Sequence, residues 1–421
     1  MAVFAGNLQN FGTSPAPRGR RKKLSVFPVT EEAEGGAAGA TPGLFRTLCA
    51  IVLTLLIIFA LIMKLFERFS RKEAAPATPS KAGNDPPMKR LLAAVCLAGA
   101  LAACAPQPAH FELAGNPIIT HIYSADPSAH VFGDSLYIYP SHDRDLAMGF
   151  DMEDYHCYVT ADMQTFEDRG VIFRPFEQTT WAKTRAWAPD CVERNGKYYL
   201  YFPTDVKYIG VAVSDRPWGP FADPLGRPLL SIDSPGVVCD RDFIDPCVFI
   251  DDDGQAYMFV GQNTCCCIKL NDDMVSYDGE VHIIEGLEEF FEAAWVHKYN
   301  GKYYLSYSNS PFNGHQPQIA YAMADSPLGP YEYKGVILGP VSSGTNHHSI
   351  VQFGADWFLF YHTGDLGNFN CPDWPGFGSL HRSVCVDYLY YNEDGTIRPV
   401  VPTVSEEKLK NNTAFRPARG L

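Results

Sequence analysis

The chain has 421 residues, of which 46% are hydrophobic and 13% aromatic, and its formal net charge at pH 7 is −14. A chain this long and this apolar can bury a sizeable core, so an intrinsically disordered protein is excluded. The acidic balance argues against a nucleic-acid partner, because phosphate binding needs clustered Lys and Arg side chains.

The first 87 residues divide into three predicted segments. Residues 1–43 are rich in Gly, Ala, Pro and charge, and we expect a disordered N-terminal extension. Residues 44–66 contain an almost unbroken apolar run from Leu48 to Met63, which is long enough for a possible transmembrane helix. Residues 67–87 are a linker rich in Pro, Ala and Lys.

Residues 88–104 carry a second export signal. They begin with Met88 and two basic residues, continue with a short apolar stretch and end in Leu101-Ala-Ala-Cys104. A secretory signal peptide is built in this way. Its end resembles the lipobox of bacterial lipoproteins, in which Cys104 would be lipidated after cleavage.

Two export signals in series have two interpretations. Either Met88 is the natural start and residues 1–87 are an upstream extension or fusion, or the first apolar run is a genuine membrane anchor with a second apolar segment behind it. Both place the chain from about residue 105 onward outside the cytoplasm. We therefore expect an exported protein, held at a membrane in the periplasm or at the surface of a bacterium by a lipid or an N-terminal helix.

Nine cysteines remain when Cys49, Cys96 and Cys104 are set aside, and they include the triplet Cys265-Cys266-Cys267. No pair has the C-x-x-C spacing of a metal site, so zinc is not expected. We expect buried free thiols, with one or two disulfides as the alternative.

Helical periodicity is nearly absent from residues 117–403, and one type of hairpin recurs five times. Each copy places a turn glycine just ahead of an aromatic strand, as in Asn-Gly196-Lys-Tyr-Tyr-Leu and Asn-Gly301-Lys-Tyr-Tyr-Leu. The five glycines are Gly133, Gly196, Gly254, Gly301 and Gly354. Their spacing of roughly fifty to sixty residues fits one four-stranded blade per repeat.

We therefore predict an all-β protein with one catalytic domain, a five-bladed β-propeller over residues 116–403. A short linker at 105–115 would precede it and a polar tail at 404–421 would follow it. A two-sheet sandwich could also be written from short strands, but it would not explain equivalent hairpins at this period.

The repeats can be aligned on the strand before each hairpin glycine, and the first column of that alignment predicts a site. The column holds Asp126, Ala188, Asp245, Glu292 and His347. Equivalent residues of the innermost strands point to the propeller axis, so three carboxylates and a histidine should converge. Crowded carboxylates raise at least one pKa, which leaves a protonated acid beside an ionised base. Glycoside hydrolysis needs that pairing.

Each residue of the column also has a structural interpretation. An Asp-Pro pair is a common turn device, so Asp126 or Asp245 alone would more often be structural. His347 alone would more often be a satisfied core histidine. Their appearance together in one column favours function.

Three stretches around these residues resemble the signatures of family 43 glycoside hydrolases. They are Tyr-Ser-Ala-Asp126-Pro-Ser-Ala, Phe-Ile-Asp245-Pro-Cys-Val and Phe-Phe-Glu292-Ala-Ala-Trp-Val-His. The resemblance runs from about Asn116 to Pro402. It implies a five-bladed propeller that inverts anomeric configuration, and many such enzymes are β-xylosidases or α-L-arabinofuranosidases. One departure is the Ala-Ala after Glu292, where the family usually has Gly-Pro or Ala-Pro.

The same resemblance implies a role for each site residue. Asp126 would be the general base, Glu292 the general acid, and Asp245 the residue that tunes the pKa of the acid and orients it. Arg382 would hydrogen-bond the sugar, and Trp187 would be a pocket aromatic that stacks on it. These two also have bland interpretations, as a surface ion-pair partner and a buried aromatic.

His347 resembles the axial histidine that in some members binds water or a calcium ion beneath the sugar. It would therefore contribute to substrate binding and, in calcium-binding members, to the metal. No cofactor is expected to be required, and a structural calcium ion is possible in this family.

The opening Asn-Pro-Ile-Ile-Thr-His-Ile-Tyr and the stretch Pro-Ser-His-Asp, which ends at Asp143, are most similar to exo-acting β-xylosidases. We therefore expect release of β-1,4-linked xylose from xylan-derived oligosaccharides. An α-L-arabinofuranosidase acting on arabino-oligosaccharides is the alternative within the family. A non-catalytic carbohydrate-binding propeller is the alternative from another class.

Overall fold

The structure is a computed structural model that describes residues 109–309 and 316–417. The predictions for residues 1–43, 44–66, 67–87 and 88–104, including lipidation at Cys104, lie outside these residues. In the described part of the chain, no helix is long and apolar enough to cross a membrane.

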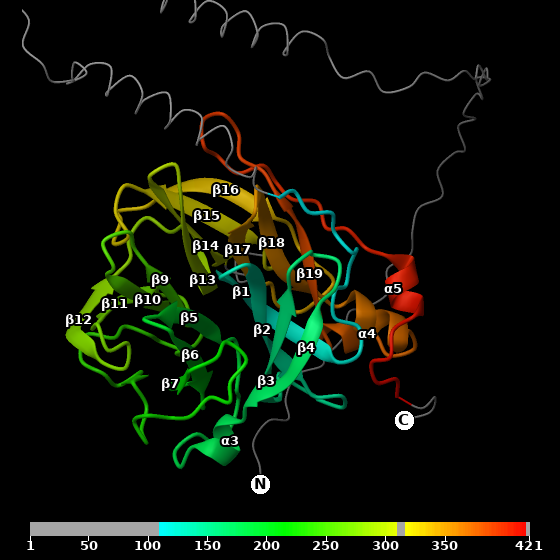
Figure 1. Cartoon of the computed structure of the whole chain (residues 1–421), viewed down its shortest axis with the longest axis horizontal. Coiled ribbons are helices and arrows are strands. Elements are labelled where there is room, and N and C mark those ends of the chain that lie inside the picture. Colours follow the sequence, from blue (N-terminus) through cyan, green and yellow to red (C-terminus); the bar gives the residue numbers. More distant parts are fainter. Residues whose placement is uncertain (1–108, 310–315, 418–421) are drawn as a thin grey trace, which may run out of the picture. The chain divides into compact units, whose positions relative to one another are not determined.

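The described chain forms five small antiparallel sheets, four with four strands and one with three (Figure 1). The first sheet consists of β1 (Tyr123–Phe132), β2 (Ser135–Asp143), β3 (Met152–Thr160) and β4 (Glu167–Phe173), and the second of β5 (Asp190–Arg194), β6 (Lys197–Thr204), β7 (Tyr208–Ser214) and β8 (Leu230–Ser231). The third sheet consists of β9 (Cys247–Ile250), β10 (Ala256–Val260), β11 (Cys266–Leu270) and β12 (Tyr277–Ile283), and the fourth of β13 (Phe290–Tyr299), β14 (Lys302–Asn309), β15 (Ile319–Ala324) and β16 (Glu332–Leu338). The fifth sheet has three strands, β17 (His348–Phe353), β18 (Asp356–Thr363) and β19 (Ser383–Leu389).

The first two strands of every sheet are one of the predicted hairpins, and the first strands of neighbouring sheets contact one another. This ring of inner strands confirms the five-bladed propeller. Local turn chemistry sets the hairpins: in two of them Asn195-Gly196 and Asn300-Gly301 adopt positive φ angles of 55° and 76°, and of 48° and 75°. A two-residue turn with both residues in this region matches the twist of the strands it joins.

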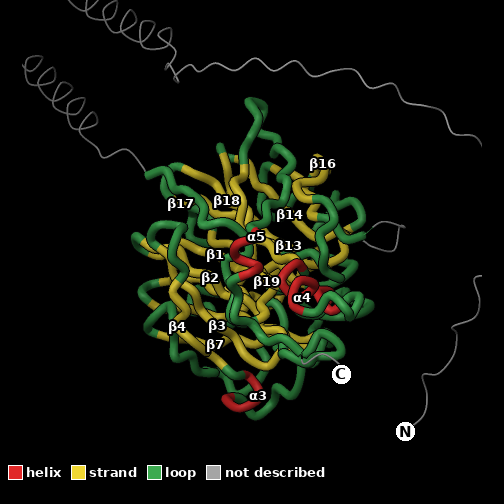
Figure 2. The backbone as a smooth tube through the Cα atoms, turned by 90° about the vertical axis from the view of Figure 1, so that its right-hand side faces the viewer, coloured by secondary structure: helices red, strands yellow, loops and turns green. Residues whose placement is uncertain are grey.

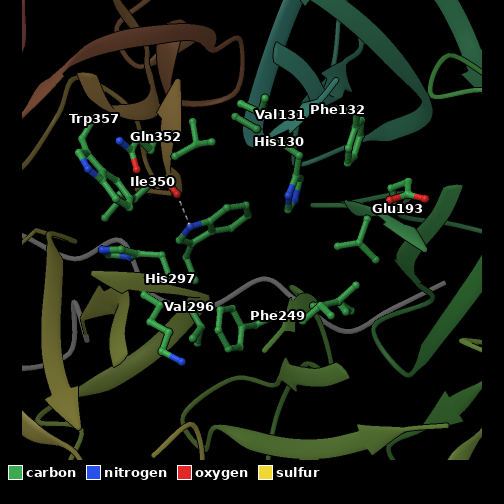
Figure 3. Close-up of a pocket in the computed structure, with 17 residues that line it drawn as sticks. His130, Val131, Phe132, Glu193, Phe249, Val296, His297, Ile350, Gln352 and Trp357 are labelled. Carbon is green, nitrogen blue, oxygen red and sulfur yellow. Dashed lines mark hydrogen bonds between the residues drawn. The ribbon is translucent and has the colours of Figure 1, made fainter. Parts of the chain in front are cut away.

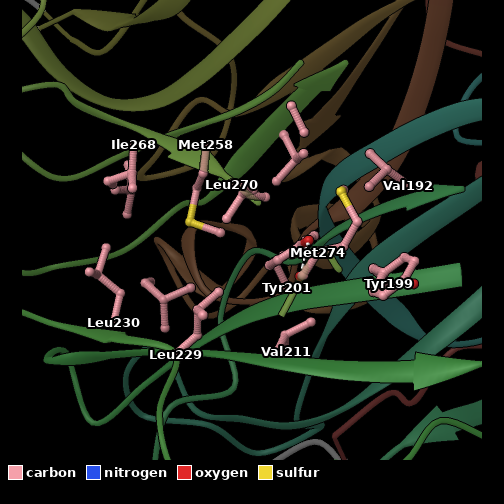
Figure 4. Close-up of a cluster of buried hydrophobic side chains, with 14 of the residues drawn as sticks. Val192, Tyr199, Tyr201, Val211, Leu229, Leu230, Met258, Ile268, Leu270 and Met274 are labelled. Atoms are coloured by element: carbon pink, nitrogen blue, oxygen red, sulfur yellow. Dashed lines mark hydrogen bonds between the residues drawn. The ribbon is translucent and has the colours of Figure 1, made fainter. Parts of the chain in front are cut away.

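The core lies between adjacent sheets, because inner and middle strands such as β2, β10 and β14 bury side chains on both faces. The cluster in Figure 4 is an example, in which Tyr201 and Val211 of the second sheet pack against Met258, Ile268 and Leu270 of the third. An equivalent cluster fills each of the other four interfaces between neighbouring blades.

The segment before β1 closes the ring against the last sheet. The N–H of Ile118 donates to the carbonyl of Val384 at 2.9 Å, and the N–H of Ser124 donates to the carbonyl of Arg382 at 2.9 Å. The side chain of Asn116 completes the pairing by exchanging hydrogen bonds of 2.9 and 2.8 Å with the backbone of Val386. The first and last blades are thereby tied together, and Arg382 is carried to the axis.

Both flanks of the predicted domain belong to the fold. In the predicted linker, Phe111 stacks on Phe353 with ring centroids 4.4 Å apart. In the predicted tail, the hydroxyl of Tyr123 donates to the carbonyl of Phe415 at 2.5 Å, and Leu409 and Phe415 pack against the buried cluster that contains this tyrosine. The apolar side chains in these otherwise polar segments explain why the folded domain is wider than 116–403.

Within residues 109–309 and 316–417 the helices are few and short (Figure 2). They are α3 (Pro175–Gln178), α4 (Asp365–Asn370), the 3₁₀ turn η2 (Phe377–Ser379) and α5 (Glu406–Lys410). All nine cysteines from Cys157 to Cys385 are free thiols, and seven of them are buried. This confirms the expectation of buried thiols over that of disulfides.

Candidate active site

The five residues of the predicted column meet in one pocket of about 670 Å³. Asp126, Ala188, Asp245, Glu292 and His347 each lie at or beside the start of the inner strand of a different sheet. Residues at equivalent positions of the five repeats therefore lie close together in the structure. The wall also contains Phe150, Trp187, Arg241, Gln262, Thr345 and Arg382.

Left-handed backbone occurs beside all three carboxylates. The φ angles of Asp126 and Asp245 are 51° and 59°, and that of Ala293, directly after Glu292, is 59°. Residues with a Cβ rarely adopt this region, and such backbone is concentrated at functional sites. Strand pairing also shifts register next to Asp126 and on both sides of Glu292. An irregularity of this kind re-aims side chains, here towards the axis.

Asp126 is held in the ionised form by Arg382. The guanidinium donates from Nη1 to Oδ1 at 2.9 Å and from Nη2 to Oδ2 at 3.4 Å, and Ser141 donates to Oδ2 at 2.6 Å. Burial alone would raise the pKa of Asp126, but Arg382, His347 and His362 outweigh it and lower that pKa to about 2. Asp126 is therefore a carboxylate at any physiological pH.

Arg382 itself has no spare donor. Its Nε and Nη2 donate to Asp143 at 3.0 and 2.8 Å, and its Nη1 also donates to Thr345 at 3.0 Å. With the two bonds to Asp126, these contacts use all five guanidinium N–H groups. Arg382 could donate a hydrogen bond to a sugar only if it gave up one of these five bonds. Its main contacts in this structure are therefore those to Asp126 and Asp143.

Glu292 has the opposite charge preference. Burial raises its pKa, and although a hydrogen bond from Gln262 opposes this, the pKa is about 7. The bond runs from Nε2 of Gln262 to Oε2 of Glu292 at 2.7 Å, and both side chains are buried. At neutral pH a substantial share of Glu292 therefore carries a proton that it can donate.

Asp245 is linked to both Asp126 and Glu292. Its Oδ2 accepts the N–H of Ala293 at 3.0 Å, which ties it to the backbone directly after Glu292. Burial, followed by the charges of Glu292 and Asp126, raises the pKa of Asp245 well above its ordinary value. Asp245 is thus coupled by contact and by charge to Glu292.

Two histidines face Asp126, the buried His362 and the partly exposed His347, and both are neutral near pH 7. Nδ1 of His347 lies 3.7 Å from Oδ1 of Asp126 and 3.7 Å from Oδ2 of Asp245. Nδ1 of His362 accepts the backbone N–H of Asp126 at 3.1 Å. Burial lowers the pKa of His347 to about 4 and that of His362 to about 3.

The surroundings of His347 do not by themselves form a calcium cage. Calcium takes six to eight oxygen ligands, whereas the two nearby carboxylates are engaged, Asp126 by Arg382 and Asp245 by the backbone of Ala293. In the described chain His347 belongs to no group of three converging metal-ligating side chains. Water would have to supply most of the ligands of a calcium ion here.

Trp187 lies in the pocket wall as predicted, and it is anchored by the loop between β2 and β3. Its indole Nε1 donates to the carbonyl of Phe150 at 2.9 Å, and the Arg185 guanidinium lies 5.1 Å from its ring. The ring of Phe150 in turn lies 5.2 Å from the guanidinium of Arg382. One loop therefore positions both an aromatic wall and the partner of Asp126.

Sequence reasoning missed four residues of this site. Gln262 and His362 lie outside the aligned column, and nothing in their local sequence singles them out. Ser141 and Asp143 belong to the Pro-Ser-His-Asp stretch, which was used only as a sign of the substrate. Their contacts join segments up to 239 residues apart, as between Asp143 and Arg382.

A second pocket, of about 440 Å³, lies at the other ends of the same inner strands (Figure 3). It is lined by aromatic and aliphatic side chains such as Phe132, Phe249 and Trp357, with His130, Glu193 and Lys298 among them. It contains none of the predicted site residues, so the chemistry is confined to the first pocket.

Known proteins resemble the chain over this whole domain. Residues 114–397 match the model of the family described as glycosyl hydrolases family 43. A xylosidase/arabinosidase 43A of Humicola insolens is 40% identical over 342 residues, which cover 67% of this chain and 98% of that protein.

Two solved structures agree. A family 43 β-xylosidase/α-arabinofuranosidase from a compost microbial metagenome, in complex with xylotriose and in a calcium-free form, has a TM-score of 0.60 and 38% identity, over 70% of this chain and 98% of that one. An α-L-arabinofuranosidase from Clostridium thermocellum has a TM-score of 0.59 and 43% identity, over 66% of this chain and 94% of that one. The chain therefore belongs to glycosyl hydrolase family 43.

Proposed function

We propose that this protein is an inverting, exo-acting glycoside hydrolase that releases pentose, with β-1,4-linked xylose from xylan-derived oligosaccharides as its main substrate. The observation that carries the proposal is the opposite charge preference of two carboxyl groups in one pocket. The pKa of Asp126 is about 2 and that of Glu292 is about 7. Near neutral pH the pocket thus offers a base and an acid together, as inversion requires.

The chemical roles follow from these charge states. Asp126 takes a proton from a water molecule as the water oxygen attacks the anomeric carbon. Glu292 gives its proton to the glycosidic oxygen as the bond between that oxygen and the anomeric carbon breaks. Asp245 holds the backbone beside Glu292, and whenever Asp245 is ionised its charge opposes ionisation of Glu292. Proton and bond changes balance: water is consumed, and the sugar leaves with inverted configuration.

Trp187 is proposed as the stacking surface for the sugar, and His347 as a neutral wall beneath it. Arg382 acts on the base, and it would contact a sugar hydroxyl only by giving up one of its present bonds. A calcium ion beside His347 remains a proposal, with water as the main source of ligands.

An α-L-arabinofuranosidase is the second candidate, because the arabinofuranosidase of Clostridium thermocellum is 43% identical to this chain. Two p-nitrophenyl glycosides, the β-D-xyloside and the α-L-arabinofuranoside, distinguish these activities. Proton NMR of the first-formed sugar tests inversion. Hydrolysis of neither glycoside and of no xylo- or arabino-oligosaccharide would refute the proposal and favour a sugar-binding propeller.

We also propose that the enzyme is exported and held at a membrane through Cys104. The support is the sequence Leu101-Ala-Ala-Cys104 after a basic and apolar stretch. Mass spectrometry of the mature N-terminus tests it: a diacylglyceryl group on Cys104 is expected, and an intact chain that begins at Met1 would contradict it.

A further inference from the structure

A cluster of polar groups outside the active site lies on the outer part of the first blade. His142 at the end of β2 and Asp154 and His156 on β3 direct one ligand atom each to a common point, and these three atoms all lie within 4.8 Å of one another. Asp154 and His156 are at least nine-tenths buried, and His142 is partly exposed. Solvent can therefore reach the point from one side.

The hydrogen bonds around the cluster leave a gap at its centre. Nδ1 of His156 lies 3.2 and 3.3 Å from the two oxygens of Asp168, so it is the ring nitrogen that donates. Nε2 of the same ring faces Oδ1 of Asp154 across 4.0 Å, which is too long for a hydrogen bond. In the neutral imidazole, Nε2 of His156 then turns an unpaired lone pair towards Oδ1 of Asp154, which is hydrogen-bonded to His142 on its other side. A cation between these atoms would bind that lone pair.

The third ligand atom converges on the same oxygen. Nδ1 of His142 is hydrogen-bonded to Oδ1 of Asp154 at 2.8 Å, and a metal ion would take the place of the proton between them. Around a tetrahedral zinc ion, ligand atoms bound at about 2.0–2.1 Å lie about 3.3 Å apart. Separations of 2.8 and 4.0 Å bracket that value. Side-chain shifts of under about 1 Å would equalise these two separations.

The outer partners are those of a metal site. A histidine that binds a metal usually donates its other N–H to a carboxylate, which fixes the ring and raises its basicity. Asp168 does this for His156, and it is itself held by the N–H of Gly170 at 2.7 Å and by His121 at 2.8 Å. Arg174 approaches Asp154 at 3.4 Å, but on Oδ2, so that Oδ1 faces only the two histidines of the cluster.

We propose that His142, Asp154 and His156 together bind one divalent transition-metal ion, such as Zn²⁺. Two imidazole nitrogens and one carboxylate oxygen suit Zn²⁺, Co²⁺ or Ni²⁺ better than Ca²⁺ or Mg²⁺, which prefer oxygen ligands. Water supplies the fourth ligand on the exposed side. Spacing of cysteines could not predict this site, because its ligands come from two strands and contain no sulfur.

The site would fasten the two ends of the loop at residues 144–151. His142 precedes this loop and Asp154 follows it, and Phe150 within it accepts the Trp187 indole N–H. A bound ion would therefore stabilise a loop that forms part of the substrate pocket.

The test uses full-length protein without a polyhistidine tag, stripped with EDTA and titrated with Zn²⁺ in a calorimeter. One ion per chain is expected, and Co²⁺ should give the visible absorption of a tetrahedral site. At a hundredfold excess over Kd, Zn²⁺ should raise Tm by about 5 °C.

Three variants assign the binding to the cluster. His156→Gln should abolish it, and His142→Gln, at the most exposed ligand, serves if the first variant fails to fold. Asp168→Asn should weaken it about 10–100-fold, because it removes the carboxylate that accepts the Nδ1–H of His156. His110→Gln is the matched control, because His110 also contacts a carboxylate, Asp356, at 2.9 Å but has no second histidine. No uptake of Zn²⁺ or Co²⁺, or uptake unchanged in folded His156→Gln and His142→Gln proteins, would overturn the proposal.

Discussion

The buried hydrogen bond from Gln262 to Glu292 allows a quantitative test of the acid. Substitution of Gln262 by Leu removes the donor that stabilises the ionised form of Glu292 at 2.7 Å. Gln262 lowers the pKa of Glu292 against the effect of burial. Its loss must therefore raise that pKa above about 7.

The size of the effect follows from the chemistry of the bond. A hydrogen bond to a charged group contributes about 1.5–3 kcal/mol, and one pKa unit corresponds to about 1.4 kcal/mol. We expect the lower end, an upward shift of about one unit, because water can partly replace the donor in an open pocket. Glu292 works when protonated, so activity is lost as pH rises through its pKa. The alkaline limb of the profile should thus move to higher pH.

The assay is kcat/KM against pH on xylobiose, because p-nitrophenolate leaves without much help from an acid. In the pH range where kcat/KM is constant, we expect kcat/KM of Gln262→Leu to be lower than that of the wild type by a factor on the order of ten, since Glu292 is less well positioned. Gln255→Leu is the matched control: this glutamine also donates from its amide, but to the carbonyls of Ala256 and Leu270 at 2.9 Å. An alkaline limb that stays in place in Gln262→Leu, or moves down, would refute the reasoning.

Four further predictions follow from the same contacts. Asp126→Ala and Glu292→Ala should each lower kcat on xylobiose on the order of 10³-fold with an unchanged circular dichroism spectrum; turnover near wild type in either would remove that residue from the mechanism. Arg382→Lys loses the paired bonds to Asp126, so the pKa of the base rises and the acidic limb of kcat/KM should move up by about one unit; an unmoved limb contradicts this. Dialysis against EGTA should leave kcat within about twofold, because the proposed mechanism assigns both proton transfers to Asp126 and Glu292, and a larger loss restored by Ca²⁺ would show that the ion near His347 is needed. Truncation of residues 404–421 should destabilise the fold by roughly 3 kcal/mol in urea unfolding, because it uncovers buried apolar surface; an unchanged midpoint would make the segment dispensable.

The sequence by itself determined the architecture and the position of the chemistry. Hairpin turns such as Asn300-Gly301 and strands that are apolar on both faces are local features, and their repetition allows only a few packings. Once the repeats were aligned, Asp126, Asp245 and Glu292 had to lie near one axis. Family resemblance then named their roles, and the structure places all three in one pocket.

Tertiary structure alone decided the charge states and the partners. The bond between Arg382 and Asp126 spans 256 positions, and Gln262 reaches Glu292 from another blade. The polar cluster at His142 likewise depends on two strands meeting side by side. Burial and the approach of distant charges set a pKa, and neither can be read from the residues on either side of a carboxylate. The sequence therefore located the two carboxyl groups proposed as acid and base, and the fold determined which of them carries the proton.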